Sequence, residues 1–98
     1  MINEKTSRMI NLIKTMSEKD RLRVAICLAD SNLSSINYDK REILKKADSR
    51  LREIDEEYKT TYVNMAKYGT VLLTSAMITE LPLEEQNKVT MFLINSIK

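Results

Sequence analysis

The sequence predicts an all-α protein, and its composition is the main reason. The chain has 98 residues, of which 43% are hydrophobic, but it has only one glycine and one proline. Ordinary usage would give about seven glycines and about five prolines in this length. Because tight turns between strands depend on such residues, sheet folds are nearly excluded. We expect residues 1–98 to form one all-helical domain.

Two amphipathic helices are predicted near the N-terminus. Residues 3–15 place Met9, Ile10 and Ile13 on one face. Ser17 is a preferred N-cap residue, and it begins a second helix over residues 18–32. The second helix contains the apolar run 24–29, which includes Cys27. A helix that is apolar almost all round is normally central, so we expect it to be buried, with Cys27 as a packing residue.

A long helix is predicted to follow. Asp39 and Glu42 have the spacing of a capping box. Beyond them, residues that are mostly apolar recur every seven positions from Leu44 to Leu72, with a companion series offset by three positions from Ala47 to Tyr68. Gly69 interrupts this pattern, either as a tolerated interior residue or as a helix end. We expect one continuous or kinked helix over 39–80, and the alternative is a chain that folds back near Glu57 or Gly69.

Pro82 ends this segment and begins the last predicted helix, which extends to about Ile97. Its predicted core face consists of Val89, Phe92, Leu93 and Ile97. The predicted fold is therefore a small helical bundle of about four helices with one long central helix. The first 30 residues of that helix alone would be about 45 Å long. A compact domain of this size is about 32 Å across.

The long helix would extend beyond its own domain, so we expect homodimerisation to complete the bundle. The predicted dimer seam is the heptad stripe of the long helix, with a folded-back monomer as the alternative. Its residues are Leu44, Leu51, Ile54, Tyr58, Met65, Tyr68 and Leu72.

Charge is unevenly distributed along the chain. The net charge is +2, yet residues 1–52 carry 12 Lys/Arg against 7 Asp/Glu, and residues 53–98 carry 4 against 7. The basic cluster that could contact a partner or nucleic acid contains Lys40, Arg41, Lys45, Lys46, Arg50 and Arg52. The acidic cluster that follows directly contains Glu53, Asp55, Glu56 and Glu57. In an antiparallel dimer centred on Leu51, the two clusters would face each other.

The sequence disfavours an enzyme. Without histidine and with a single cysteine and a single glycine, the chain lacks the usual general base, multi-cysteine metal sites and phosphate-binding loops. Paired-carboxylate chemistry needs a pocket, and the acidic cluster is interpreted as a solvated helix face. We expect no catalytic residues, no cofactor and no metal.

Binding to another macromolecule is the predicted function. The first hypothesis is a small non-enzymatic regulator or inhibitor of a protein target, of the kind that bacteria, phages and plasmids encode. The second is a nucleic-acid-binding transcriptional regulator that uses residues 40–52. A third, an immunity-like helical bundle, matches in size only. No secretory signal is visible, and the longest charge-free run, 68–79, is shorter than the roughly 20 residues of a membrane span. A cytoplasmic location without membrane contact is expected.

Overall fold

The computed structural model describes residues 4–30, 40–60 and 68–97, and this part of the chain is all-helical. It contains six helices, and the radius of gyration is 12.7 Å. That radius is close to the roughly 12.6 Å expected of a compact chain of this length. The helices are α1 (Glu4–Thr15), α2 (Glu18–Asp30), α3 (Lys40–Ile54), α4 (Glu56–Thr60), α5 (Gly69–Thr79) and α6 (Leu83–Asn95).

The predicted boundary between the first two helices is confirmed. Ser17 Oγ accepts the backbone N–H of Asp20 at 3.2 Å, and its carbonyl accepts the N–H of Arg21 at 3.0 Å. The bond from Asp20 satisfies a donor that the first turn of a helix otherwise leaves without a partner, and the bond from Arg21 is the first one within the helix. Glu18 and Asp20 add negative charge to the same turn, where the helix dipole favours it.

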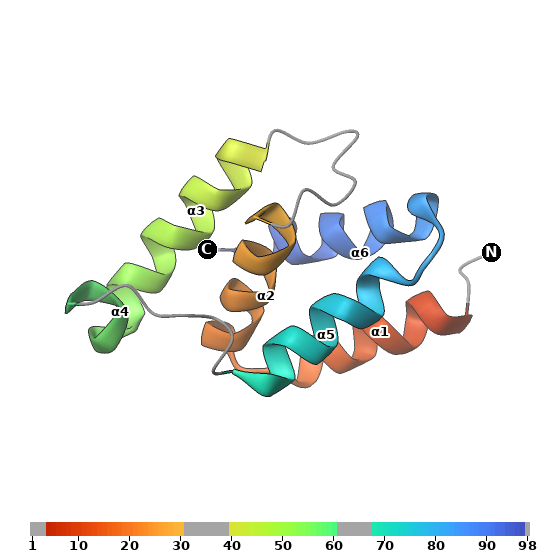
Figure 1. The fold of residues 1–98 in the computed structure, drawn as a ribbon, viewed down its shortest axis with the longest axis horizontal. Coiled ribbons are helices and arrows are strands. Elements are labelled where there is room, and N and C mark those ends of the chain that lie inside the picture. Colours follow the sequence, from red (N-terminus) through yellow and green to blue (C-terminus); the bar gives the residue numbers. More distant parts are fainter. Residues whose placement is uncertain (1–3, 31–39, 61–67, 98) are drawn as a thin grey trace.

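Helix α2 is central, as its apolar sequence predicted. It lies between α3 on one side and α5 and α6 on the other (Figure 1). One side of α2 contributes Val24 and Leu28 to a core cluster with α1, α5 and α6. The other side contributes Leu22, Ala25 and Ile26 to a second cluster with α3 and α4. Two cores therefore share one helix, which explains why α2 carries apolar residues in nearly every direction. Cys27 is half-buried and packs against the first cluster.

The prediction of one long helix over 39–80 is wrong. Helix α3 ends at Ile54, α4 begins at Glu56, and Gly69 is the first residue of α5. Asp55 forms the corner between α3 and α4, because its N–H still bonds to Leu51 O at 2.8 Å while its Oδ1 accepts the N–H of Glu57 at 3.1 Å. The carboxylate thus caps α4, so the chain turns where the heptad pattern continues. Asp39 and residues 61–67 lie outside the described residues.

The last turn and helix confirm the prediction made from Pro82. Pro82 has φ −55°, and its carbonyl accepts the N–H groups of Glu85 and Gln86, each at 2.9 Å. The buried Gln86 amide donates to Thr79 O at 3.0 Å and to Leu81 O at 2.8 Å, which joins the end of α5 to α6. Val89 and Leu93 are buried in the first cluster, and Phe92 packs against it.

Candidate functional site

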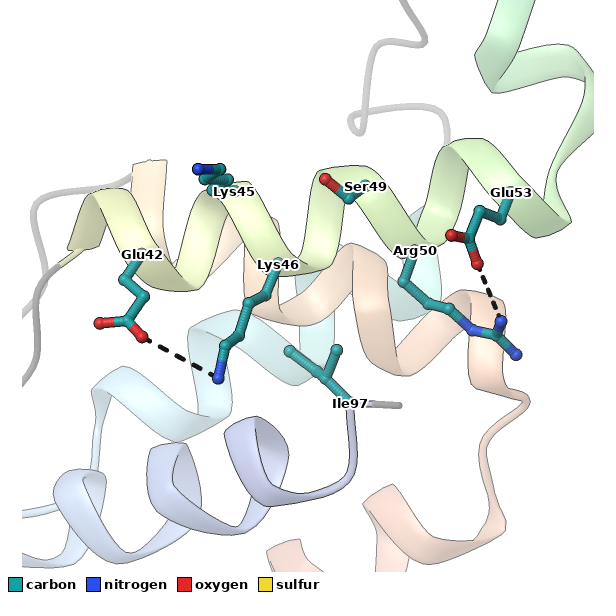
Figure 2. A pocket seen from close by; sticks show the side chains of 7 residues that line it. All are labelled: Glu42, Lys45, Lys46, Ser49, Arg50, Glu53 and Ile97. Carbon is teal, nitrogen blue, oxygen red and sulfur yellow. Dashed lines mark hydrogen bonds and ion pairs between the residues drawn. The ribbon is translucent and has the colours of Figure 1, made fainter.

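A groove with a volume of about 460 Å³ lies along α3 where this helix meets the end of the chain after α6. We call it the α3 groove (Figure 2). Six of its residues come from one stretch of α3, where positions three and four apart share a helix face. The seventh follows the end of α6. The lining residues are Glu42, Lys45, Lys46, Ser49, Arg50, Glu53 and Ile97.

Ile97 is the apolar residue of the groove. Figure 2 shows its side chain between those of Lys46 and Arg50. Ile97 is half-buried and packs against the second core cluster, which fixes its position beneath α3. The groove therefore combines an apolar contact with charged walls.

Arg50 is held in place by carboxylates from two helices. Its Nε and Nη2 donate to the two carboxylate oxygens of Glu18 at 2.8 and 3.1 Å, and its Nη1 donates to Glu53 at 3.1 Å. The hydrogen bonds to Glu18 and Glu53 raise the pKa of Arg50 above its usual value. A bidentate pair of this geometry is directional, so Arg50 joins α3 to the start of α2. Carboxylates of the same chain therefore neutralise much of the positive charge of Arg50.

Arg52 belongs to the corner between α3 and α4. Its Nε donates to Asp48 at 2.9 Å, and its guanidinium lies 5.2 Å from the centre of the Tyr58 ring. Tyr58 also donates its hydroxyl to Asp48. Burial raises the pKa of Asp48, but the hydrogen bonds from Tyr58 and Arg52 outweigh it, and the net pKa is lowered. Arg52 therefore faces its own chain as well as solvent.

The exposed positive charge is concentrated at the start of α3. Arg41 and Lys45 are exposed, and the Lys46 Nζ lies 4.0 Å from Glu42, the outer limit of an ion pair. The side chain of Lys40 is not among those that the structure describes. The basic cluster predicted from the sequence is thus divided. Its exposed lysines lie near the start of α3, whereas the half-buried Arg50 and the exposed Arg52 form short ion pairs with carboxylates.

The acidic cluster is divided as well, and its interpretation as a solvated face is wrong for Asp55. Asp55 is only 6% exposed, and it accepts a hydrogen bond from Arg23 Nη2 at 2.8 Å. Burial raises the pKa of Asp55, yet the hydrogen bond and charge of Arg23 outweigh it and lower the pKa overall. Glu53 pairs with Arg50, and Glu56 and Glu57 are exposed.

The predicted dimer seam does not form one continuous face. Leu51 and Tyr58 are buried within the second cluster, and Leu44 and Ile54 pack against it. Tyr68 packs against both clusters, whereas Leu72 is exposed. Met65 lies outside the described residues. A dimer could therefore not use the centre of this stripe, because Leu51 and Tyr58 pack against α2 within the chain.

Sequence reasoning missed an exposed apolar face on α5. Val71, Thr74 and Ile78 are the buried side of this helix. The opposite side, which we call the α5 stripe, consists of the exposed residues Leu72, Leu73, Ala76 and Met77. The charge-free run 68–79 was a usable signal for this face. Its length was compared only with that of a membrane span.

Comparison of the chain with protein-family models, curated proteins and solved structures gives no match. Within residues 4–30, 40–60 and 68–97, no group of three or more His, Cys, Asp or Glu side chains is placed to hold a metal ion. No helix in those ranges is long and apolar enough to cross a membrane. Among the described residues, the α3 groove and the α5 stripe are two surface features suited to contact with another molecule.

Proposed function

We propose that the protein acts by binding another protein, as a small non-enzymatic regulator or inhibitor, and that the α3 groove contacts the target. The observation that carries the proposal is the exposure of Lys45 and Lys46 beside the apolar side chain of Ile97. This arrangement fits a protein segment that carries acidic side chains next to an apolar one. Arg50, fixed by Glu18, gives the groove a rigid wall.

The charge of α3 favours an acidic target. The helix carries six Lys/Arg and three Asp/Glu, a balance of +3, while the whole chain is only +2. A local excess of one sign steers oppositely charged partners and contributes to specificity. Five of the seven residues that line the groove are charged, which favours a partner with charged side chains of its own.

A nucleic-acid backbone is the second candidate. The exposure of Arg41, Lys45 and Lys46 within one turn and a half of helix favours it, since phosphate contacts come from such side chains. The ion pairs of Arg50 and Arg52 with carboxylates count against it, because phosphates would have to compete for those two guanidinium groups. For this reason the protein target is preferred.

We further propose that the protein forms a homodimer. The α5 stripe supports this part of the proposal, because it exposes several large apolar side chains next to one another. Contiguous exposed apolar surface is a mark of protein interaction sites. A dimer would present two α3 grooves, which raises the apparent affinity for a target with two binding segments.

The test is affinity capture from the cells that express the protein, with and without nuclease. The wild type is compared with a Lys45→Glu/Lys46→Glu variant and with a control, Lys14→Glu/Lys19→Glu, which makes the same charge change on exposed positions of α1 and α2. We expect a protein partner that survives nuclease, remains with the control and is lost from the α3 variant. A partner that the α3 variant retains, or that disappears with nuclease, would overturn the proposal.

A further inference from the structure

We propose that the α5 stripe is a self-association face, and that a second copy of the chain packs its own α5 against it in the antiparallel direction. This inference rests on the proposed homodimer and assigns its surface and its orientation. It does not depend on the identity of the target of the α3 groove.

The composition of α5 is that of a helix covered on both sides. From Gly69 to Thr79 the helix contains no charged residue, although only one of its sides faces the core. Leu72, Leu73 and Met77 are 43%, 63% and 39% exposed. The hydroxyl groups of Thr74 and Ser75 donate to backbone carbonyls of the preceding turn, so these polar side chains do not need water as a partner. A helix that is apolar on both sides is normally covered on both sides.

The α5 stripe is complementary to a second copy of itself. The outward positions of α5 and its C-cap are Gly69, Leu72, Leu73, Ala76, Met77 and Glu80. In an antiparallel pair with a two-fold axis between Thr74 and Ser75, Leu73 lies level with the partner's Ala76, and Leu72 with the partner's Met77. Leu73, the most exposed side chain of the stripe, then meets the small Ala76, which allows the helices to approach and interdigitate. A two-fold dimer uses the same patch on both copies, as this spacing permits.

Charge selects the antiparallel orientation. Glu80 is the C-cap of α5, where its negative charge opposes the dipole of its own helix. At the other end, Tyr68 provides no side-chain cap, the first turn contains no acidic residue, and Gly69 and Thr70 are exposed. The antiparallel pair brings each Glu80 level with the partner's Gly69, at an N-terminus that favours negative charge. A parallel pair would instead place Glu80 against the partner's Glu80.

A hollow of about 270 Å³ lies at the C-terminal end of the stripe. It is bordered by Met77, Glu80 and Leu81, and on the α1 side by Lys5, Arg8 and Met9. The partner's Leu72 lies level with Met77 in the antiparallel pair, so the hollow offers room for a side chain from the second copy. The α3 groove stays open in this dimer, because α2 separates α3 from α5 (Figure 1).

The first test is the mass of the protein in solution at micromolar concentration, measured by sedimentation or light scattering. The wild type should approach twice 11.4 kDa. Leu73→Lys should give the monomer mass while keeping the helical spectrum and a cooperative melt, because this side chain is mostly exposed. Met91→Lys is the matched control, since Met91 is 46% exposed but lies on α6, and it should remain dimeric.

The second test is a charge swap that probes orientation. A Cβ at Gly69 would meet no atom within 4 Å, so Gly69→Asp should leave the fold intact. In the antiparallel dimer, however, the new carboxylate faces the partner's Glu80 and should weaken self-association by about tenfold. Adding Glu80→Lys to Gly69→Asp should restore the wild-type dissociation constant.

Each outcome decides the inference. A wild type that stays monomeric overturns both the homodimer and this surface, while leaving the capture test of the α3 groove unaffected. A dimer that survives Leu73→Lys overturns the surface and leaves the homodimer standing. If Leu73→Lys abolishes the dimer but Glu80→Lys does not rescue Gly69→Asp, the surface stands and the antiparallel arrangement is overturned.

Discussion

The guanidinium of Arg23 donates to the carboxylate of Asp55 across 2.8 Å, and this pair joins the middle of α2 to the corner between α3 and α4. Arg23 also pairs with Asp20 at 2.7 Å and lies 4.0 Å from the centre of the Tyr68 ring. The side chains of Arg23 and Asp55 are only 11% and 8% exposed. One arginine therefore contacts three separate parts of the chain, and it fixes the direction in which the chain leaves α3.

Removing the charge of Asp55 should destabilise the fold. Asp55→Asn keeps the shape of the side chain but leaves Arg23 with one carboxylate partner in a nearly buried position. Removing one partner of a buried ion pair costs about 3–5 kcal/mol, and we expect a loss near the lower end of this range. Urea unfolding followed by circular dichroism measures the change. Glu56→Gln, which alters the exposed neighbour, should stay within about 0.5 kcal/mol, and an equal loss in both variants would show that Asp55 has no special role.

Stability should fall with acid in a defined range. The pKa values of Asp48 and Asp55 are lowered in the folded state, so both carboxylates release protons more readily there than in the unfolded chain. Their stabilisation is complete above the unfolded-state pKa of about 3.9 and is lost as the pH falls through the lower folded-state values. The chain has no histidine, so stability should be nearly constant from about pH 5 to 8. Urea midpoints measured across pH 2–8 test this, and a steep decline between pH 7 and 5 would contradict it.

Leu51 should behave as a core residue of the single chain. It lies on α3 and is fully buried against α2. Leu51→Ala should therefore leave a cavity and lower the free energy of unfolding by about 2–5 kcal/mol. If Leu51 belonged instead to an intermolecular seam, the variant would lower the solution mass and its loss of stability would depend on protein concentration. Thermal melts at two concentrations a hundredfold apart distinguish the two cases, and we expect the same loss at both.

The sequence predicted the parts of the fold that depend on local signals. Ser17 and Pro82 mark helix starts through their own backbone and side-chain chemistry, and the apolar run in α2 indicates burial on both sides. The alternative break near Glu57 was named but not preferred, because separate helices that each bury one stripe can continue the same heptad spacing. Asp55 followed by Glu56 and Glu57 was a usable signal, since an N-cap followed by acidic residues is typical of a helix start.

The candidate site could be predicted only in part. The basic cluster was identified, but the division within it depends on Glu18, which is 32 positions from Arg50 in the sequence. Likewise, the role of Asp55 depends on Arg23 from the preceding helix. Such pairs depend on how helices pack, and spacing along one helix carries no information about them. The α5 stripe was missed because its heptad residues were assigned to a single long helix that does not form.

The most direct test of the proposed function is a photo-crosslinking amino acid at Ser49, an exposed position of the α3 groove. The same group at the exposed Asn11 of α1 is the matched control. Irradiation in the cells that express the protein should give a protein adduct at Ser49 that resists nuclease, is absent at Asn11, and is lost when Lys45→Glu and Lys46→Glu are added. An adduct to nucleic acid, or a protein adduct that forms equally at Asn11 or persists in the Lys45→Glu/Lys46→Glu background, would contradict a protein-binding α3 groove.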